Sequence, residues 1–123
     1  MAVILHVDDS SFSRLQIGKV LKRGGHTVLA ADNGKSALEL LRTTAPDLIV
    51  SDILMPEMDG FAFLEALRDG GNSIPVVMVT ADIQKDTGAI CCGLGAAALF
   101  NKPPDEEQLL AFITNALTKD ISS

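Results

Sequence analysis

The sequence predicts an α/β fold of three layers, with a parallel sheet enclosed between helices. Short apolar runs of four to six residues alternate along the chain with five segments of helical spacing. The runs are continuous rather than alternating, which is typical of strands buried on both faces. The chain has 123 residues, of which 47% are hydrophobic and 21% charged, so we expect a single domain, residues 1–123, with a core of its own.

Five strands are predicted from the apolar runs, several of which are rich in Val, Ile and Leu. They cover residues 2–7, 27–30, 48–51, 75–79 and 97–100. Strands that are joined by helices in this way form parallel sheets with right-handed crossovers. The pattern does not reveal the order of the strands in the sheet, because each strand is apolar on both faces.

Five helices are predicted from apolar residues at helical spacing. They cover residues 11–23, 35–44, 61–69, 83–94 and 105–118. The first and third end at glycine pairs, and the second ends before Pro46, all of which are stop signals. The fourth is the weakest, because Gly88 and Gly93 lie within it. The fifth opens with three acidic residues, which the positive end of a helix dipole favours.

Composition and charge exclude several classes of protein. The net charge of −6 is the opposite of the footprint expected for binding nucleic acid or an anionic membrane. No apolar stretch approaches the roughly 20 residues of a membrane helix, and the start lacks the basic region of a signal peptide. The two cysteines, 91 and 92, are adjacent, which fits neither a disulfide framework nor a structural zinc site. We therefore expect a cytoplasmic protein.

Polar side chains follow four of the five predicted strands. They are Asp8 and Asp9 after the first strand, Asp52 after the third, Thr80 after the fourth and Lys102 just beyond the fifth. Parallel strands end at one edge of the sheet, and ligands bind at that edge. Each residue also has an ordinary explanation on its own: Asp9 and Ser10 as helix caps, Asp52 as a turn residue, Thr80 as a strand or cap residue and Lys102 as a solvated charge.

The combination of these residues favours a phosphoryl site over the separate explanations. Three carboxylates at one edge repel one another unless a cation lies between them, and oxygen ligands suit Mg²⁺. A hydroxyl and an ammonium group opposite the metal suit the remaining oxygens of a phosphoryl group. One carboxylate in such a site can attack phosphorus and become an aspartyl phosphate.

The motifs that carry these residues resemble the response-regulator receiver domain of two-component signalling. They are residues 7–10 (VDDS), 51–60 (SDILMPEMDG), 79–81 (VTA) and 101–103 (NKP). The resemblance runs from end to end of the chain, in the right order and spacing. Among receiver domains, the chain is most similar to single-domain regulators of the chemotaxis type.

The resemblance implies a flavodoxin-like sheet of order 2-1-3-4-5 and a signalling protein rather than an enzyme. Asp52 would accept a phosphoryl group from a sensor histidine kinase, and Thr80 and Lys102 would bind phosphoryl oxygens. The ligands of Mg²⁺ would be Asp9, Asp8 largely through water, Asp52 and the backbone carbonyl of Leu54. A downstream target or a phosphatase would bind the fourth helix, the fifth strand and the fifth helix. The Lys102–Pro103 bond would be cis.

One position departs from the family pattern. Receiver domains commonly have Tyr or Phe three residues before the lysine, where this chain has Leu99. Phe100 is expected to point to the opposite face of the strand. We therefore expect the segment after Thr80, rather than an aromatic ring, to carry most of the signal.

Other functions stay open from the residues alone. A phosphorelay intermediate would pass the phosphoryl group on to a histidine phosphotransfer protein. A phosphatase of the haloacid dehalogenase type would need a second Asp two residues after Asp52, where the chain has Leu54. An FMN carrier would need a phosphate-cradling loop in place of Asp8 and Asp9. The residues left over are interpreted as structural: His6 and His26 as core or surface residues, Cys91 and Cys92 as packing residues, and Met55 and Met58 as packing or contact-surface residues.

Overall fold

The computed structural model describes residues 2–81 and 83–122, with the side chains of the last helix described as far as residue 118. Within these residues five strands alternate with five helices. The strands are β1 (Val3–Val7), β2 (Thr27–Ala31), β3 (Leu48–Asp52), β4 (Val76–Thr80) and β5 (Ala98–Asn101). The helices are α1 (Ser11–Arg23), α2 (Gly34–Leu41), α3 (Gly60–Asp69), α4 (Thr87–Gly93) and α5 (Glu106–Ser122).

All strand pairs are parallel, and their order in the sheet is β2-β1-β3-β4-β5. The predicted fold class and the order implied by the resemblance are therefore confirmed. Val7 of β1 lies opposite Ser51 of β3, so these two strands end side by side. The chain winds outward from β1 to β2 and then crosses back to β3, and ligands of open α/β sheets bind where the strand order reverses in this way.

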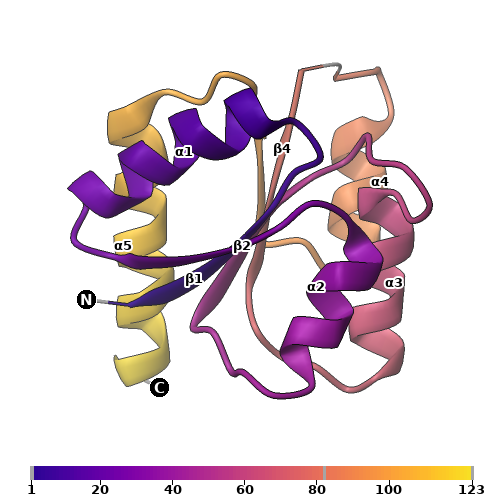
Figure 1. Cartoon of the computed structure of the whole chain (residues 1–123), viewed down its shortest axis with the longest axis horizontal. Helices are drawn as coiled ribbons and strands as arrows, with labels where there is room; N and C mark the ends of the chain where they lie inside the picture. The colour runs from indigo at the N-terminus through magenta and orange to yellow at the C-terminus, as the bar shows by residue number, and fades with distance from the viewer. Residues whose placement is uncertain (1, 82, 123) are drawn as a thin grey trace.

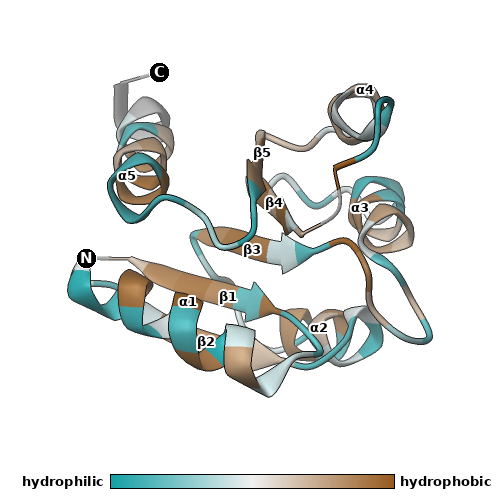
Figure 2. Ribbon diagram, turned by 90° about the horizontal axis from the view of Figure 1, so that it is seen from above, coloured by the Kyte–Doolittle hydropathy of each residue, from teal (hydrophilic) through white to brown (hydrophobic). Residues whose placement is uncertain are grey.

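The helices cover both faces of the sheet (Figure 1). Helices α1 and α5 lie against one face, while α2, α3 and α4 lie against the other (Figure 2). The hydropathy colours of Figure 2 show β1 and β3 as largely apolar strands between these two layers. The three layers arise because each strand has apolar side chains on both faces and each helix has one apolar side to bury against them.

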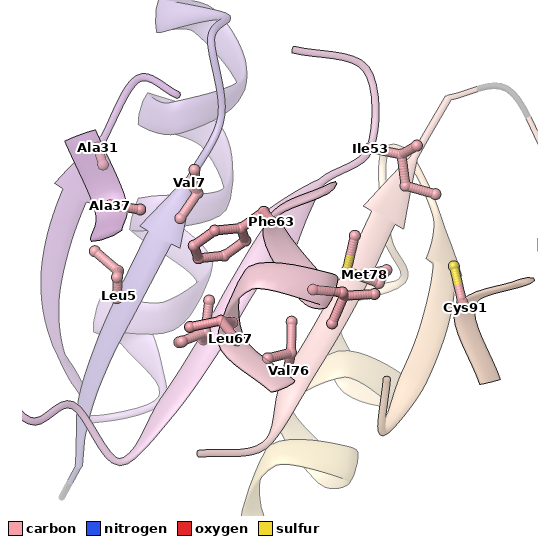
Figure 3. Close-up of a cluster of buried hydrophobic side chains, with 12 residues drawn as sticks. Leu5, Val7, Ala31, Ala37, Ile53, Phe63, Leu67, Val76, Met78 and Cys91 are labelled. Carbon is pink, nitrogen blue, oxygen red and sulfur yellow. The ribbon is translucent and has the colours of Figure 1, made fainter. Parts of the chain in front are cut away.

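The core forms two clusters, one on each face of the sheet. The cluster under α2, α3 and α4 is built around Phe63, Leu5 and Met78 (Figure 3). The cluster under α1 and α5 includes Ile4 and Ile113. Neighbouring residues Ile4 and Leu5 enter different clusters because successive side chains of a strand point to opposite faces. Burying a side chain of this size stabilises the fold by roughly 1.5–3 kcal/mol.

Two helices, α4 and α2, are shorter than predicted. Helix α4 begins at Thr87 rather than at residue 83, since the Gln84 amide donates to the Thr87 hydroxyl at 2.8 Å. Helix α2 ends at Leu41 rather than at residue 44, where the Thr44 hydroxyl donates to the Leu40 carbonyl at 2.6 Å. Asp82, which directly precedes the predicted fourth helix, lies outside the described residues.

The remaining boundaries agree with the prediction to within one or two residues, except that α5 continues to Ser122. The predicted first helix, residues 11–23, has the observed bounds, and Ser10 caps it by accepting a hydrogen bond from the Ser13 amide. In the described part of the chain, none of the helices is both long enough and apolar enough to span a membrane.

Candidate functional site

The three predicted acidic residues meet at the carboxyl edge of the sheet. Asp8 and Asp9 follow β1, and Asp52 is the last residue of β3. One carboxylate oxygen from each residue lies within 4.8 Å of the other two. Asp8 and Asp52 are buried, with 1% and 6% of their surface exposed, whereas Asp9 is exposed. Two buried carboxylates and one exposed carboxylate therefore share one small site.

Lys102 bridges the two buried carboxylates. Its Nζ lies 2.8 Å from Oδ2 of Asp8 and 2.9 Å from Oδ2 of Asp52. The other carboxylate oxygens accept backbone amides, from Ser10 at 2.9 Å and from Ile53 at 2.7 Å. Burial of Lys102 by itself lowers its pKa, but the hydrogen bonds and charges of Asp8 and Asp52 outweigh burial and raise the pKa above its usual value. The ammonium group is therefore firmly charged.

Asp9 differs from its two neighbours in having no hydrogen bond or ion pair with any residue that the structure describes. Of the two candidate caps of α1, Ser10 is confirmed as the cap, whereas Asp9 does not cap the helix. Together with the two buried carboxylates beside it, this exposed carboxylate provides a set of hard oxygen donors. That set fits a divalent cation such as Mg²⁺, which binds one or two carboxylates directly and keeps several waters.

Thr80 and Lys102 lie at the ends of the neighbouring strands β4 and β5, with Lys102 one residue beyond β5. Thr80 is the last residue of β4 and is 1% exposed. Its carbonyl accepts the Lys102 amide at 2.9 Å, which fixes the two residues side by side. The peptide bond between Lys102 and Pro103 is cis, as the resemblance implies. Leu54 lies in the loop between β3 and α3, and its side chain is exposed.

Arg14 also belongs to the site, although no motif in the sequence indicated it. Its Nη1 donates to the backbone carbonyl of Asp8 at 2.6 Å. The contact joins the first turns of α1 to the end of β1, so it depends on the direction of a side chain that no spacing rule specifies. The one available signal was a basic residue close to the start of a helix, where the dipole disfavours positive charge.

His6 lies behind the site as a buried residue. It is 1% exposed, its Nε2 lies 3.9 Å from Oδ2 of Asp8, and its Nδ1 has no partner. Burial, together with the charges of Lys102 and Arg14, lowers the pKa of His6 to about 4. The imidazole is therefore neutral at pH 7, in agreement with the interpretation of His6 as a core residue.

The strand face of Leu99 agrees with the prediction. Leu99 lies opposite Met78 and packs against the cluster under α3 and α4. Phe100 enters the other cluster, where its ring meets that of Phe112 edge to face at 6.0 Å. Thr80 is two residues beyond Met78 and therefore points to the same face as Leu99. No aromatic side chain takes the place of Leu99 on that face of β5.

Cys91 and the methionines of the 51–60 motif also pack as expected. Cys91 is buried in the cluster under α4, and Met55 and Met58 pack against the same cluster. Cys92 is exposed. None of these side chains joins the acidic site.

Comparison with known proteins agrees with the geometry. The sequence profile of the response regulator receiver domain matches residues 4–114. Protein PilH of Pseudomonas aeruginosa is 39% identical over 95% of this chain and 98% of its own length. Chemotaxis protein CheY of Bacillus subtilis is 34% identical over 93% of this chain and 96% of its own. Some relatives are longer: the chain spans 25% of the DNA-binding transcriptional regulator NtrC of Escherichia coli, with 32% identity.

The fold agrees as well. The structure of chemotaxis protein CheY4 of Vibrio cholerae superimposes with a TM-score of 0.86 and 31% identity, covering 94% of this chain and 98% of that one. Receiver domains are signalling modules that bind Mg²⁺ at an acidic pocket, and the cluster of Asp8, Asp9 and Asp52 forms such a pocket here. The matched sequence, the strand order and the acidic pocket together show that this chain belongs to the response regulator receiver domain family.

Proposed function

We propose that Asp52 accepts a phosphoryl group from the histidine of a sensor kinase, in a reaction that requires Mg²⁺. The observation that carries the proposal is the position of the Asp52 carboxylate. It lies at the switch point of the sheet, hydrogen-bonded to an ammonium group, with two further carboxylates within 4.8 Å. This arrangement places a nucleophilic oxygen beside an ammonium group that can pair with a phosphoryl oxygen, and beside carboxylates that would hold a cation.

The reaction is an in-line displacement at phosphorus. One Oδ atom of Asp52 forms a bond to phosphorus while the bond from phosphorus to the donor imidazole nitrogen breaks. The nitrogen keeps the electron pair of that bond, and the product is an aspartyl phosphate. With acetyl phosphate as the donor, the bond that breaks is phosphorus to oxygen, and acetate leaves. Attack of water on phosphorus later returns Asp52 and inorganic phosphate.

The residues around Asp52 divide the remaining roles. Asp8, Asp9, Asp52 and the carbonyl of Leu54 would hold Mg²⁺. The bound cation offsets the negative charge of carboxylates and phosphoryl oxygens. Lys102 would exchange its contact with Oδ2 of Asp52 for a phosphoryl oxygen, keeping its charge.

The Thr80 hydroxyl would bind another phosphoryl oxygen from the end of β4, next to the Lys102 backbone. The ammonium group of Lys102 already lies in the site, so this positive charge does not have to move in when the phosphoryl group binds.

The output would come from the surface of α4, β5 and α5. Thr80 precedes α4, which contains Gly88 and Gly93 and is therefore weakly stable on its own. Movement of the Thr80 hydroxyl toward a phosphoryl oxygen would displace the segment that leads into α4. A target protein or phosphatase that prefers the displaced form gains affinity by the difference between its two binding free energies.

The regulator would act as a single, stand-alone domain in the cytoplasm, in a pathway of the chemotaxis type. The matches to PilH and CheY over 98% and 96% of their own lengths support this part of the proposal.

An NMR comparison of the Mg²⁺ form with and without beryllofluoride, which stands in for the phosphoryl group, tests the route of the signal. We expect shifts that extend to residues 83–104. A Leu99→Tyr variant should change partner affinity modestly and leave the rate of phosphorylation unchanged.

The acceptor is tested by incubating the protein with phosphoramidate and MgCl₂ and measuring the intact mass. We expect one added phosphoryl group that is labile to hydroxylamine and absent in EDTA, because an acyl phosphate is formed. The variant Asp52→Asn should gain none. Asp69→Asn is the matched control, because Asp69 is an exposed carboxylate at the far end of α3. The same labile adduct on Asp52→Asn would refute the assignment.

A further inference from the structure

The peptide unit between Asp8 and Asp9 is held from two directions. The sheet ladder of β1 reaches Val7, and the Asp8 amide donates to the carbonyl of Ala31 at 3.1 Å. The Asp8 carbonyl points out of the ladder and accepts Nη1 of Arg14 at 2.6 Å. The direction in which the chain leaves the sheet, and hence the position of the Asp9 Cα, is therefore fixed by a side chain of α1.

Helix α1 places Arg14 in reach of that carbonyl. The Arg14 amide donates to the Ser10 carbonyl at 2.9 Å, which closes the first turn of the helix. Helical side chains lean toward the N-terminus, so that of Arg14 extends back toward the end of β1. A positive charge close to the start of a helix is unfavourable, and the first turn of α1 contains no acidic residue to offset it. The contact with the Asp8 carbonyl explains why an arginine occupies a position where the helix dipole disfavours positive charge.

Asp9 depends on this contact more than Asp8 does. The carboxylate of Asp8 is fixed by the Ser10 amide and by Lys102. The carboxylate of Asp9 has no partner among the described residues, so its direction is set by the backbone alone. We infer that Arg14 is a positioning residue for the acidic site: by holding the Asp8 carbonyl, it directs the Asp9 carboxylate toward the cation. The inference rests on the proposed function of this site.

The charge of Arg14 and its position predict opposite effects on cation binding. If Arg14 acted only through its charge, removing it would relieve a repulsion and strengthen Mg²⁺ binding. If Arg14 positions the peptide unit, removing it loosens a ligand and weakens Mg²⁺ binding, as loss of a group that orients a metal ligand typically does by 10-fold or more. The sign of the change therefore separates the two explanations.

The test compares Arg14→Gln with Arg23→Gln, which removes the same charge from the other end of α1, where Arg23 pairs with Glu106. Amide shifts in an NMR titration with MgCl₂ report the dissociation constant. We expect it to rise about 10-fold in Arg14→Gln and to stay within about twofold in Arg23→Gln. With phosphoramidate as the donor, the MgCl₂ concentration for half-maximal phosphorylation should rise by the same factor, while the rate at saturating MgCl₂ is unchanged.

A second readout needs neither metal nor phosphate. In EDTA, hydrogen exchange of the Ser10 amide should be faster in Arg14→Gln, because that amide donates to Asp8. The variant Arg14→Lys keeps the charge with a shorter reach, and we expect its Mg²⁺ affinity to fall about threefold. If Arg14→Gln does not fold, Arg14→Lys still separates positioning from charge, because a purely electrostatic role predicts wild-type Mg²⁺ affinity for Arg14→Lys.

Wild-type or tighter Mg²⁺ binding by Arg14→Gln, with unchanged exchange of the Ser10 amide, would overturn the inference. Failure of the proposed function looks different. In that outcome Asp52 gains no phosphoryl group in the wild-type protein, while the effects of Arg14→Gln on Mg²⁺ affinity and amide exchange persist and support the positioning role.

Discussion

Replacement of Gly60 by alanine should destabilise the protein, although Gly60 is the first residue of a helix. A Cβ atom at this position would lie 2.5 Å from the carbonyl oxygen of Asp52 and 2.7 Å from Cα of Ile53. It would also lie 2.6 Å from the end of the Met78 side chain, which can move. The two backbone atoms cannot move easily, because the Gly60 amide donates to the Ile53 carbonyl at 2.7 Å.

The expected cost follows from two opposing effects. Inserting a methyl group where backbone atoms are in the way costs up to about 3 kcal/mol. The preference of helices for alanine over glycine returns up to about 1 kcal/mol. The net loss in the free energy of unfolding is therefore about 2 kcal/mol. Phosphorylation should also slow, because relief of the overlap displaces the backbone of Asp52 itself.

Urea unfolding followed by circular dichroism measures this change, since the chain has no Trp or Tyr for fluorescence. Gly18→Ala is the matched control, because Gly18 lies inside α1 and its added Cβ would have no atom within 4 Å. That variant should gain up to about 1 kcal/mol and be phosphorylated at the wild-type rate. If both substitutions changed stability in the same direction, the close approach of α3 to the end of β3 would not be the reason for glycine at position 60.

Three further changes test the charges and the backbone around the site. Asp9→Asn should raise the stability of the metal-free protein by about 1 kcal/mol in thermal melts, because it removes like-charge repulsion. A large increase in the melting temperature of this variant on addition of MgCl₂ would contradict the role of Asp9 as a ligand. His6 has a pKa of about 4 in the folded protein, below its ordinary value, so its stabilising effect is complete above about pH 6.5 and decreases as the pH falls toward 4. The wild type should lose about 2 kcal/mol more than His6→Leu between pH 7.5 and 5 in urea unfolding, and equal losses would show that His6 is not buried neutral. Glu57 has a φ of 65°, which Asn tolerates better, so Glu57→Asn should stabilise the protein by roughly 0.5–1 kcal/mol, whereas a loss would mean that the Glu57 side chain holds the loop.

The elements of the fold were predictable because they depend on local patterns. A strand buried on both faces must be apolar throughout, so the run 48–51 identified β3. The bounds of α4 were less predictable, because the hydroxyl of Thr87 forms a turn with Gln84 that competes with the helix. The order of the strands followed from the resemblance and not from the pattern, because a strand that is apolar on both faces gives no sign of its neighbours.

The linear pattern of residues was enough to identify which side chains lie at the ends of the strands, and parallel strands bring those ends to one edge of the sheet. It therefore predicted that Asp8, Asp52 and Lys102 would lie together. Packing of the whole domain was needed for Lys102 to bridge the carboxylates of Asp8 and Asp52, across 50 residues of chain in the case of Asp52. It also brings Arg14 against the carbonyl of the peptide unit between Asp8 and Asp9. Local preferences act over a few neighbouring residues, whereas the direction of a long side chain is decided by the packing of whole helices against the sheet.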